Sequence, residues 1–175
     1  MHGRNLFLFL GNTLGNELNE QAVLKSIAQA MQPNDLIIIE LQLKEQNPLP
    51  VDEISKIFQT NLQFYAGPLL ALGCQETNLE IQALADLHSR PNSWTYFCEC
   101  KIPTAVTRYI SPIARTLIFG GEGTTINTYV IRKFAEDAIE PLLREAGLTI
   151  RLKLASKAIG TRKRRFQYIV AEREK

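Results

Sequence analysis

The sequence predicts an α/β fold, and three observations lead to it. Two apolar runs, Leu6–Leu10 and Leu36–Leu41, flank a helical pattern, which is the arrangement of a parallel βαβ unit. Residues 92–130 hold short segments rich in aromatic and β-branched residues, separated by glycines and prolines, as is typical of antiparallel strands. Two alternating segments near the end, Thr149–Ala155 and Phe166–Glu172, predict an antiparallel hairpin.

The first apolar run ends in a polar turn, Gly11-Asn12-Thr13-Leu14-Gly15-Asn16. A run without alternation indicates a strand that is covered on both faces. The turn lies at the carboxyl end of this strand, where open α/β sheets bind their ligands. Asn19 is then expected to cap a helix whose apolar positions repeat at helical spacing as far as Met31.

Three further helices are expected, the first of them capped by Asp52 and running through Ile54, Ile57, Phe58 and Leu62. Asn78 is a plausible cap for the second, with an apolar face formed by Leu79, Ile81, Leu84 and Leu87. The third runs from about Arg132 to Ala146 and ends at Gly147 in the C′ position. Pro141 inside it is expected to kink or restart it.

The bulk properties narrow the class of protein. A chain of 175 residues fits one domain with a proper core, and a net charge of +2 gives no indication of a nucleic-acid partner. The apolar stretches are too short to cross a bilayer and no signal-peptide pattern is present, which predicts a cytoplasmic protein. The odd number of cysteines (Cys74, Cys98 and Cys100) predicts reduced thiols, and no metal site is expected.

Three segments carry a resemblance to a known family. Phe9-Leu10-Gly11-Asn12-Thr13-Leu14-Gly15-Asn16 resembles a turn of the histidine-specific methyltransferases, the family that includes the enzyme trimethylating histidine on the way to ergothioneine. Gly121-Glu122, followed by Ile126–Phe134, resembles a later motif of that family. Glu145-Ala146-Gly147-Leu148, followed by Phe166–Glu172, resembles the end of a class I S-adenosylmethionine-dependent methyltransferase.

The resemblance implies a partial Rossmann-like methyltransferase sheet, from its fourth strand onward, with an antiparallel β insertion and a C-terminal antiparallel hairpin. Residues 1–175 would form a single domain. Within it, residues 1–91 and 131–175 would be the methyltransferase half and residues 92–130 an insertion like the family's substrate domain.

The resemblance also implies S-adenosyl-L-methionine as cofactor and an amino-acid-like amine as substrate. Gly11 and Thr13 would lie near the cofactor, and Asn16, Glu122 and Tyr129 would bind the substrate. Tyr129 stands where the family has a glutamate. The family's glycine-rich cofactor loop has no counterpart in this sequence, so the chain alone is expected to be inactive, and no catalytic residue is proposed.

Other interpretations of the same residues stay open. Residues 11–16 also suit a simple helix-entry turn, Glu122 a hairpin turn, and Tyr129 an interior position in a sheet. The alternative function is a catalytically inactive, truncated relative that serves as an oligomeric binding module. Arg162-Lys163-Arg164-Arg165 would suit nucleic acid, although a solvated turn explains this run more simply.

The strand at Leu6–Leu10 is expected to have an uncovered edge. In the methyltransferase sheet it lies between two strands, and only one of them, Leu36–Leu41, is found here. A bare apolar edge favours aggregation. If the chain begins at Met1, we expect either a homodimer or a complementing N-terminal half to cover this strand and the apolar face beside it.

Overall fold

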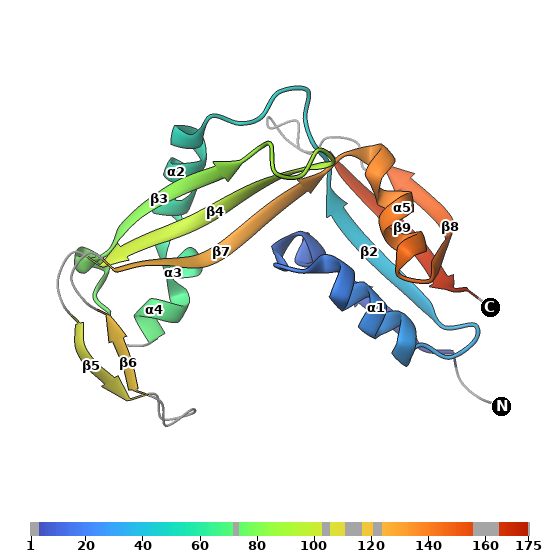
Figure 1. The fold of residues 1–175 in the computed structure, drawn as a ribbon, viewed down its shortest axis with the longest axis horizontal. Coiled ribbons are helices and arrows are strands. Elements are labelled where there is room, and N and C mark those ends of the chain that lie inside the picture. Colours follow the sequence, from blue (N-terminus) through green and yellow to red (C-terminus); the bar gives the residue numbers. More distant parts are fainter. Residues whose placement is uncertain are drawn as a thin grey trace. The chain divides into compact units, whose positions relative to one another are not determined.

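The computed structural model describes residues 4–71, 74–102, 106–110, 117–120, 124–155 and 165–174 (Figure 1). The chain divides into two compact units. Unit 1 comprises Met1–Pro48, Asp86–Thr95 and Ile131–Lys175, and unit 2 comprises Leu49–Ala85 and Tyr96–Val130.

Unit 1 contains a four-stranded mixed sheet in the order β1-β2-β9-β8. The strands are β1 (Leu6–Phe9), β2 (Leu36–Gln42), β8 (Leu148–Ala155) and β9 (Phe166–Arg173). β1 and β2 are parallel, whereas β9 is antiparallel to both of its neighbours. The α/β class, the parallel βαβ unit and the C-terminal hairpin are thus confirmed.

The helices of unit 1 lie on one face of this sheet. They are α1 (Glu20–Ala30), α5 (Ile139–Glu145) and the short 3-10 turns η1 (Thr13–Asn16) and η3 (Glu136–Ala138). The Asn19 side chain accepts a hydrogen bond from the Ala22 backbone N–H at 3.0 Å, so the expected cap is confirmed. The core between helices and sheet includes Leu24 and Ala28 of α1, Ile139 and Leu143 of α5, Ile37 and Ile39 of β2, and Ile169 and Ala171 of β9.

The opposite face of the sheet is mainly apolar. By register it carries Leu6 and Leu8 of β1, Leu36, Ile38 and Glu40 of β2, Tyr168, Val170 and Glu172 of β9, and Leu152 and Leu154 of β8, together called the open face below. Four of its leucines (Leu6, Leu8, Leu152 and Leu154) are between 47% and 55% exposed. From Leu36 to Ile39, β2 is apolar on both sides, as strands covered on both faces are. No described helix of unit 1 covers the open face.

β1 is the edge strand of the described sheet and pairs there only with β2, as expected for a strand with one neighbour. Its residues, Leu-Phe-Leu-Phe, carry no charge. Natural proteins usually protect such an edge with charges, proline or a covering segment. The edge and the open face therefore form one mainly apolar surface that no described element of unit 1 covers.

Unit 2 pairs short helices with antiparallel strands. The helices are α2 (Val51–Thr60), α3 (Leu62–Tyr65), α4 (Gly67–Ala71) and η2 (Glu76–Asn78), and the strands are β3 (Glu80–Asp86), β4 (Ser93–Ile102), β5 (Val106–Ile110), β6 (Leu117–Gly120) and β7 (Thr124–Phe134). β3, β4 and β7 form one sheet, in which neighbouring strands run in opposite directions (Figure 1). β5 and β6 form a separate antiparallel pair.

The helix expected after Asn78 is wrong, because Glu80–Asp86 is strand β3. Burial along it alternates with a period of two: Ile81 and Ala83 are buried, whereas Gln82 and Leu84 are exposed. Pairing with β4 overrides the helical spacing of the leucines.

The helix expected from Arg132 is also corrected. β7 continues to Phe134, and α5 begins only at Ile139. Pro141 therefore lies in the first turn of α5, where its missing N–H has no intrahelical partner to lose, so it neither kinks nor breaks the helix. Gly147 follows α5 with a positive φ of 78°, which confirms its C′ role.

Candidate functional site

The polar turn at residues 11–16, called the turn site below, follows β1 at its carboxyl end. Gly11 and Asn12 both have positive φ angles, of 69° and 59°. Glycine and asparagine are the residues that adopt this conformation at least cost. Thr13 closes the turn, because both its backbone N–H and its hydroxyl donate to the Leu10 carbonyl.

Asn12 holds the turn site in place. Its side-chain oxygen accepts a hydrogen bond from the Gln42 N–H at 2.9 Å, and its side-chain nitrogen donates to the Arg132 carbonyl at 3.2 Å. The residue is buried. One amide thereby ties the turn to the end of β2 and to β7, and satisfies two backbone groups that would otherwise be buried without partners.

Gly15 is required for this arrangement. A Cβ atom at this position would lie 2.5 Å from the side-chain nitrogen of Asn12 and 2.7 Å from the Arg132 carbonyl oxygen. The turn can approach β7 this closely only with glycine.

A carboxylate reaches the exposed side of the turn site. The backbone N–H of Gly11 donates to Oε2 of Glu40, on β2, at 2.9 Å. Gly11 and Thr13 are exposed, and Asn16 is half-buried at the end of η1. The Asn16 side chain makes no hydrogen bond to any residue in the part of the chain that the structure describes. Its amide is therefore available to a ligand.

A buried ion-pair network lies beside the turn. Glu20, the first residue of α1, accepts from Arg132 through Oε2 and from Arg90 through Oε1, the latter at 2.6 Å. Arg132 also donates to the Glu17 carbonyl at 3.0 Å and to the Thr95 hydroxyl at 3.3 Å. Burial lowers the pKa of the Arg132 guanidinium, while the Glu20 carboxylate opposes that shift.

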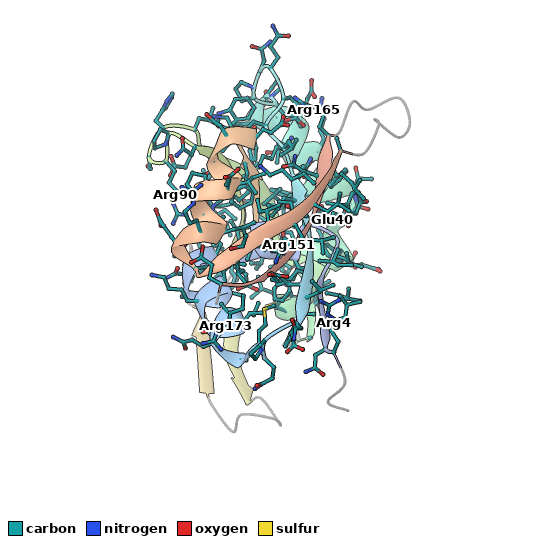
Figure 2. All side chains as sticks on the ribbon, turned by 90° about the vertical axis from the view of Figure 1, so that its right-hand side faces the viewer. Arg4, Glu40, Arg90, Arg151, Arg165 and Arg173 are labelled. Atoms are coloured by element: carbon teal, nitrogen blue, oxygen red, sulfur yellow. The ribbon has the colours of Figure 1, made fainter. Side chains whose placement is uncertain are left out.

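A cavity of about 270 Å³ adjoins the outer end of this network. Glu20, Arg90, Asn92, Pro141 and Glu145 are among the residues that line it. Figure 2 shows Arg90 on the helix side of the unit 1 sheet and Glu40 on the other side. Arg90 of the ion-pair network and Glu40 at the turn site thus lie on opposite sides of the unit 1 sheet.

Tyr129 belongs to unit 2, where it forms part of an aromatic cluster. Its ring centroid lies 5.2 Å from that of Tyr65 and 5.4 Å from that of Phe64. Tyr65 in turn packs on the buried ring of Phe58 at 4.6 Å. Burial, and secondarily Tyr65, raise the pKa of the Tyr129 hydroxyl, so the ring stays neutral at physiological pH.

The structure therefore brings together some of the expected site residues. Gly11, Thr13 and Asn16 share the turn site, and Tyr129 lies in the other unit. Glu122 falls outside the described residues, as do Arg162, Lys163 and Arg164 of the basic run. Arg165 is described, and it pairs with Glu136 at 3.0 Å.

Sequence reasoning missed Asn12, Glu20 and Arg132. The signals were weak but present: asparagine directly after a turn glycine, and an arginine on the same strand face as the apolar Val130 and Phe134. An arginine on a strand's buried face needs a carboxylate partner, and only the folded structure identifies it as Glu20.

The thiols agree with the expectation, since Cys74, Cys98 and Cys100 are all free, and Cys98 and Cys100 are buried. Across the described residues, no three His, Cys, Asp or Glu side chains are grouped so as to hold a metal ion. No helix among the described residues has the length and hydropathy needed to span a membrane.

No protein-family model and no curated protein matches the chain. Its structure is similar to solved S-adenosylmethionine-dependent methyltransferases. One from Clostridium acetobutylicum is 10% identical, with a TM-score of 0.42 over 100% of this chain and 61% of the other. The CcbJ methyltransferase from Streptomyces caelestis is 12% identical, with a TM-score of 0.39 over 100% and 60%. The glycopeptide N-methyltransferase MtfA in complex with S-adenosyl-L-methionine is 9% identical, with a TM-score of 0.40 over 100% and 57%. The chain thus spans about six-tenths of the length of these structures.

Proposed function

We propose that the chain is the acceptor-side part of an S-adenosylmethionine-dependent methyltransferase that acts on an amino-acid-like amine. The observation that carries the proposal is the turn site. It follows a parallel strand at its carboxyl end, it is fixed by the buried Asn12 amide, and it presents Gly11, Thr13 and Asn16 on its accessible side. Ligands of open α/β sheets bind at such strand ends.

The roles of the residues follow from their chemistry and from the sequence resemblance. Asn16 would contact the carboxylate or the amine of the acceptor, and Glu122 and Tyr129 would add acceptor contacts. Gly11 and Thr13 would lie near the methyl donor, which supplies an already activated methyl group. The protein then needs mainly to align the acceptor nitrogen, a task for rigid backbone and small polar groups.

The residues present fit the acceptor better than the donor. The sequence has no G-x-G-x-x-G loop, and its one glycine-rich stretch, Gly120-Gly121-Glu122-Gly123, lies outside the βαβ unit, away from where the family's loop holds the methionine and ribose parts of the donor. We therefore assign the chain no step in handling the donor, and infer that a complementing N-terminal half completes that side of the site.

Binding at the turn site can be tested by NMR on isotope-labelled protein titrated with amino acids. We expect an amine-bearing amino acid to shift the Gly11, Thr13 and Asn16 amide signals, and the Asn16→Ala variant to lose the effect. With a donor-binding half supplied in trans, Asn16→Ala should lower kcat/KM for methyl transfer by about 10- to 100-fold, because the acceptor is misplaced.

Asn47→Ala is the matched control, since Asn47 is an exposed asparagine of the same unit outside the turn site. It should leave both measurements unchanged. Amide shifts that survive Asn16→Ala, or an acceptor that never shifts these signals, would contradict the proposal.

A second candidate function, an oligomeric binding module without catalysis, is favoured by the open face. We propose that a second copy of the chain covers this face, by sheet-on-sheet packing around a two-fold axis. The face is mainly apolar and the edge strand β1 is uncharged, so two copies can meet on its leucines. Of the two carboxylates on the face, Glu40 accepts from the Gly11 N–H and Glu172 pairs with Arg151. The three free cysteines suit a reducing, cytoplasmic location for either function.

Light scattering over a range of protein concentrations tests the homodimer. The native chain should be dimeric, and Leu8→Lys should make it monomeric, because a charge would be buried in the interface. Leu18→Lys is the control, since Leu18 is 72% exposed and lies outside the sheet. A monomeric native chain at all concentrations, or a Leu8→Lys variant that stays dimeric, would contradict this assembly and favour a complementing half as the occupant.

A further inference from the structure

The cavity of about 270 Å³ beside the ion-pair network has no part in the proposed function. Its lining comes from α1, η3, α5, residues 89–93 and the end of β7, all of which belong to unit 1. Phe134 and Leu142 contribute apolar surface, whereas Arg90 and Glu145 contribute charges of opposite sign. Ligand pockets span about 300–1,000 Å³, so a cavity of this size suits a small molecule.

Arg90 carries a positive charge that the chain balances only in part. Its Nη1 donates to Oε1 of Glu20 at 2.6 Å, and Arg132 donates to Oε2 of the same carboxylate. Two guanidinium groups thus share one carboxylate, which leaves one positive charge in excess. Burial lowers the pKa of the Arg132 guanidinium, Glu20 opposes this shift, and the nearby charge of Arg90 adds to it. Because Arg132 is buried, the accessible cation is Arg90, whose side chain is 47% exposed.

Most donors of the Arg90 guanidinium remain free to bind a ligand. A guanidinium has five N–H donors, and the bond to Glu20 is the one that this side chain makes among the described residues. The fork of donors matches a carboxylate, which can accept two parallel bonds. The carboxylate of a ligand in the cavity can therefore pair with Arg90 without displacing Glu20.

Glu145 is a second charged group of the lining, and it has no partner. It is the last residue of α5, it is exposed, and its carboxylate makes no ion pair or hydrogen bond with the residues that the structure describes. Its neighbour in the sequence, Arg144, instead pairs with Glu140 at 2.9 Å. A cation is favoured over an anion at the carboxyl end of a helix. The lining thus offers a position for an ammonium group as well as one for a carboxylate.

We propose that this cavity binds a zwitterion, namely a free amino acid with an apolar side chain. Arg90 holds its carboxylate, Glu145 holds its ammonium group, and Phe134 and Leu142 pack on its side chain. A ligand with one charge fits less well, because a simple anion also meets Glu145 and a simple amine also meets Arg90. The inference goes beyond the proposed function, since Arg90 and Glu40 of the turn site lie on opposite sides of the sheet (Figure 2).

The test is an NMR titration of the isotope-labelled chain with leucine and with two analogues that each lack one charge. Isocaproate lacks the ammonium group of leucine, and isoamylamine lacks its carboxylate. Leucine should shift the Ala138, Leu142 and Glu145 amide signals. It should bind about three- to tenfold more tightly than either analogue, because only leucine pairs with both Arg90 and Glu145. Equal binding of leucine and either analogue would overturn the inference.

Two variants test which residue holds which group. Arg90→Gln should weaken the binding of leucine and isocaproate by about three- to tenfold without weakening that of isoamylamine. Glu145→Gln should weaken the binding of leucine and isoamylamine by a similar factor without weakening that of isocaproate. Both variants should fold, since Glu20 keeps its bond to Arg132 in the first and Glu145 is exposed in the second. A variant that weakens both analogues alike would contradict the assignment.

Arg144→Gln is the control, since it removes an exposed cation of α5 that does not line the cavity. It should leave all three affinities unchanged. The result is separate from that of the proposed function, because the cavity and the turn site have different amide signals. Cavity signals that leucine does not shift, with intact Asn16-dependent shifts at the turn site, would reject the zwitterion site alone. The reverse outcome would reject the turn site alone.

Discussion

Replacing Glu20 by leucine should lower the free energy of unfolding by about 3–5 kcal/mol, because a buried charge would lose its counter-ion. The Glu20 side chain is 10% exposed and accepts from both Arg132 and Arg90. Arg132 is 3% exposed, and without Glu20 its remaining partners would be the neutral Thr95 hydroxyl and Glu17 carbonyl. Urea unfolding at neutral pH, followed by circular dichroism, measures the change.

The order of effects within the network is a sharper test. Arg132→Leu should destabilise less than Glu20→Leu, since Glu20 then keeps its bond to the half-exposed Arg90. The double variant should recover much of the Glu20→Leu loss, because no buried charge is left unpaired. Glu140→Leu is the control. It breaks exposed pairs with Arg144 and Lys153 and should hardly move the unfolding midpoint. A Glu20→Leu loss no larger than that of Glu140→Leu would contradict the buried network.

The parts of the fold that were predicted correctly are those whose signals are local. Asn19 caps α1 through a bond to the N–H three residues ahead, and Gly147 ends α5 through its own backbone angle. The apolar runs of β1 and β2, with a helix between them, admit few arrangements other than a parallel pair. Each of these features is decided within a few residues, so the sequence pattern suffices.

The errors arise where distant partners decide the structure. Arg132 and Lys133 resemble the exposed face of a helix, yet both are buried in β7. Their carboxylate partners, Glu20 and Glu45, lie 112 and 88 positions earlier in the chain. In β3 the leucine spacing fits a helix, and only the neighbouring strand β4 selects the alternating pattern.

The candidate site shows the same contrast between features decided locally and features decided by distant residues. Gly11, Thr13 and Asn16 could be grouped from the sequence because they share one turn. The role of Asn12 could not be derived, because its two partners, Gln42 and Arg132, lie 30 and 120 positions away. What sequence reasoning takes for a simple turn is, in the structure, a point where three distant segments are joined.

The second large effect is expected at Gly15. Alanine there would place Cβ 2.5 Å and 2.6 Å from the side-chain nitrogen and oxygen of Asn12, and 2.7 Å from the Arg132 carbonyl oxygen. Asn12 can move aside only by losing its bonds to the Gln42 N–H and the Arg132 carbonyl. We expect Gly15→Ala to cost about 2–4 kcal/mol in urea unfolding, through overpacking and newly unpaired buried groups.

Alanine substitutions at two other glycines distinguish the cost of steric crowding from the cost of backbone strain. Gly67, on α4, has open space around its Cβ position, so Gly67→Ala should be neutral or slightly stabilising. Gly11 also has open space but a φ of 69°, so Gly11→Ala should cost about 1–2 kcal/mol from the left-handed backbone alone. An effect at Gly15 no larger than that at Gly11 would mean that the turn tolerates a wider separation from β7.

A double-variant cycle connects this crowding to Asn12. Glycine tolerates the positive φ at position 12, so Asn12→Gly causes no backbone strain there. It removes the side chain that lies closest to the Cβ of an alanine at position 15. In that background Gly15→Ala should therefore cost less than in the native chain, because only the Arg132 carbonyl still obstructs it. Both variants should also weaken the effect of amino acids on the Asn16 amide signal, since the Asn12 side chain is what fixes the turn that presents Asn16. Additive stabilities, together with an unchanged Asn16 response, would contradict the inference that Asn12 and Gly15 act as one unit.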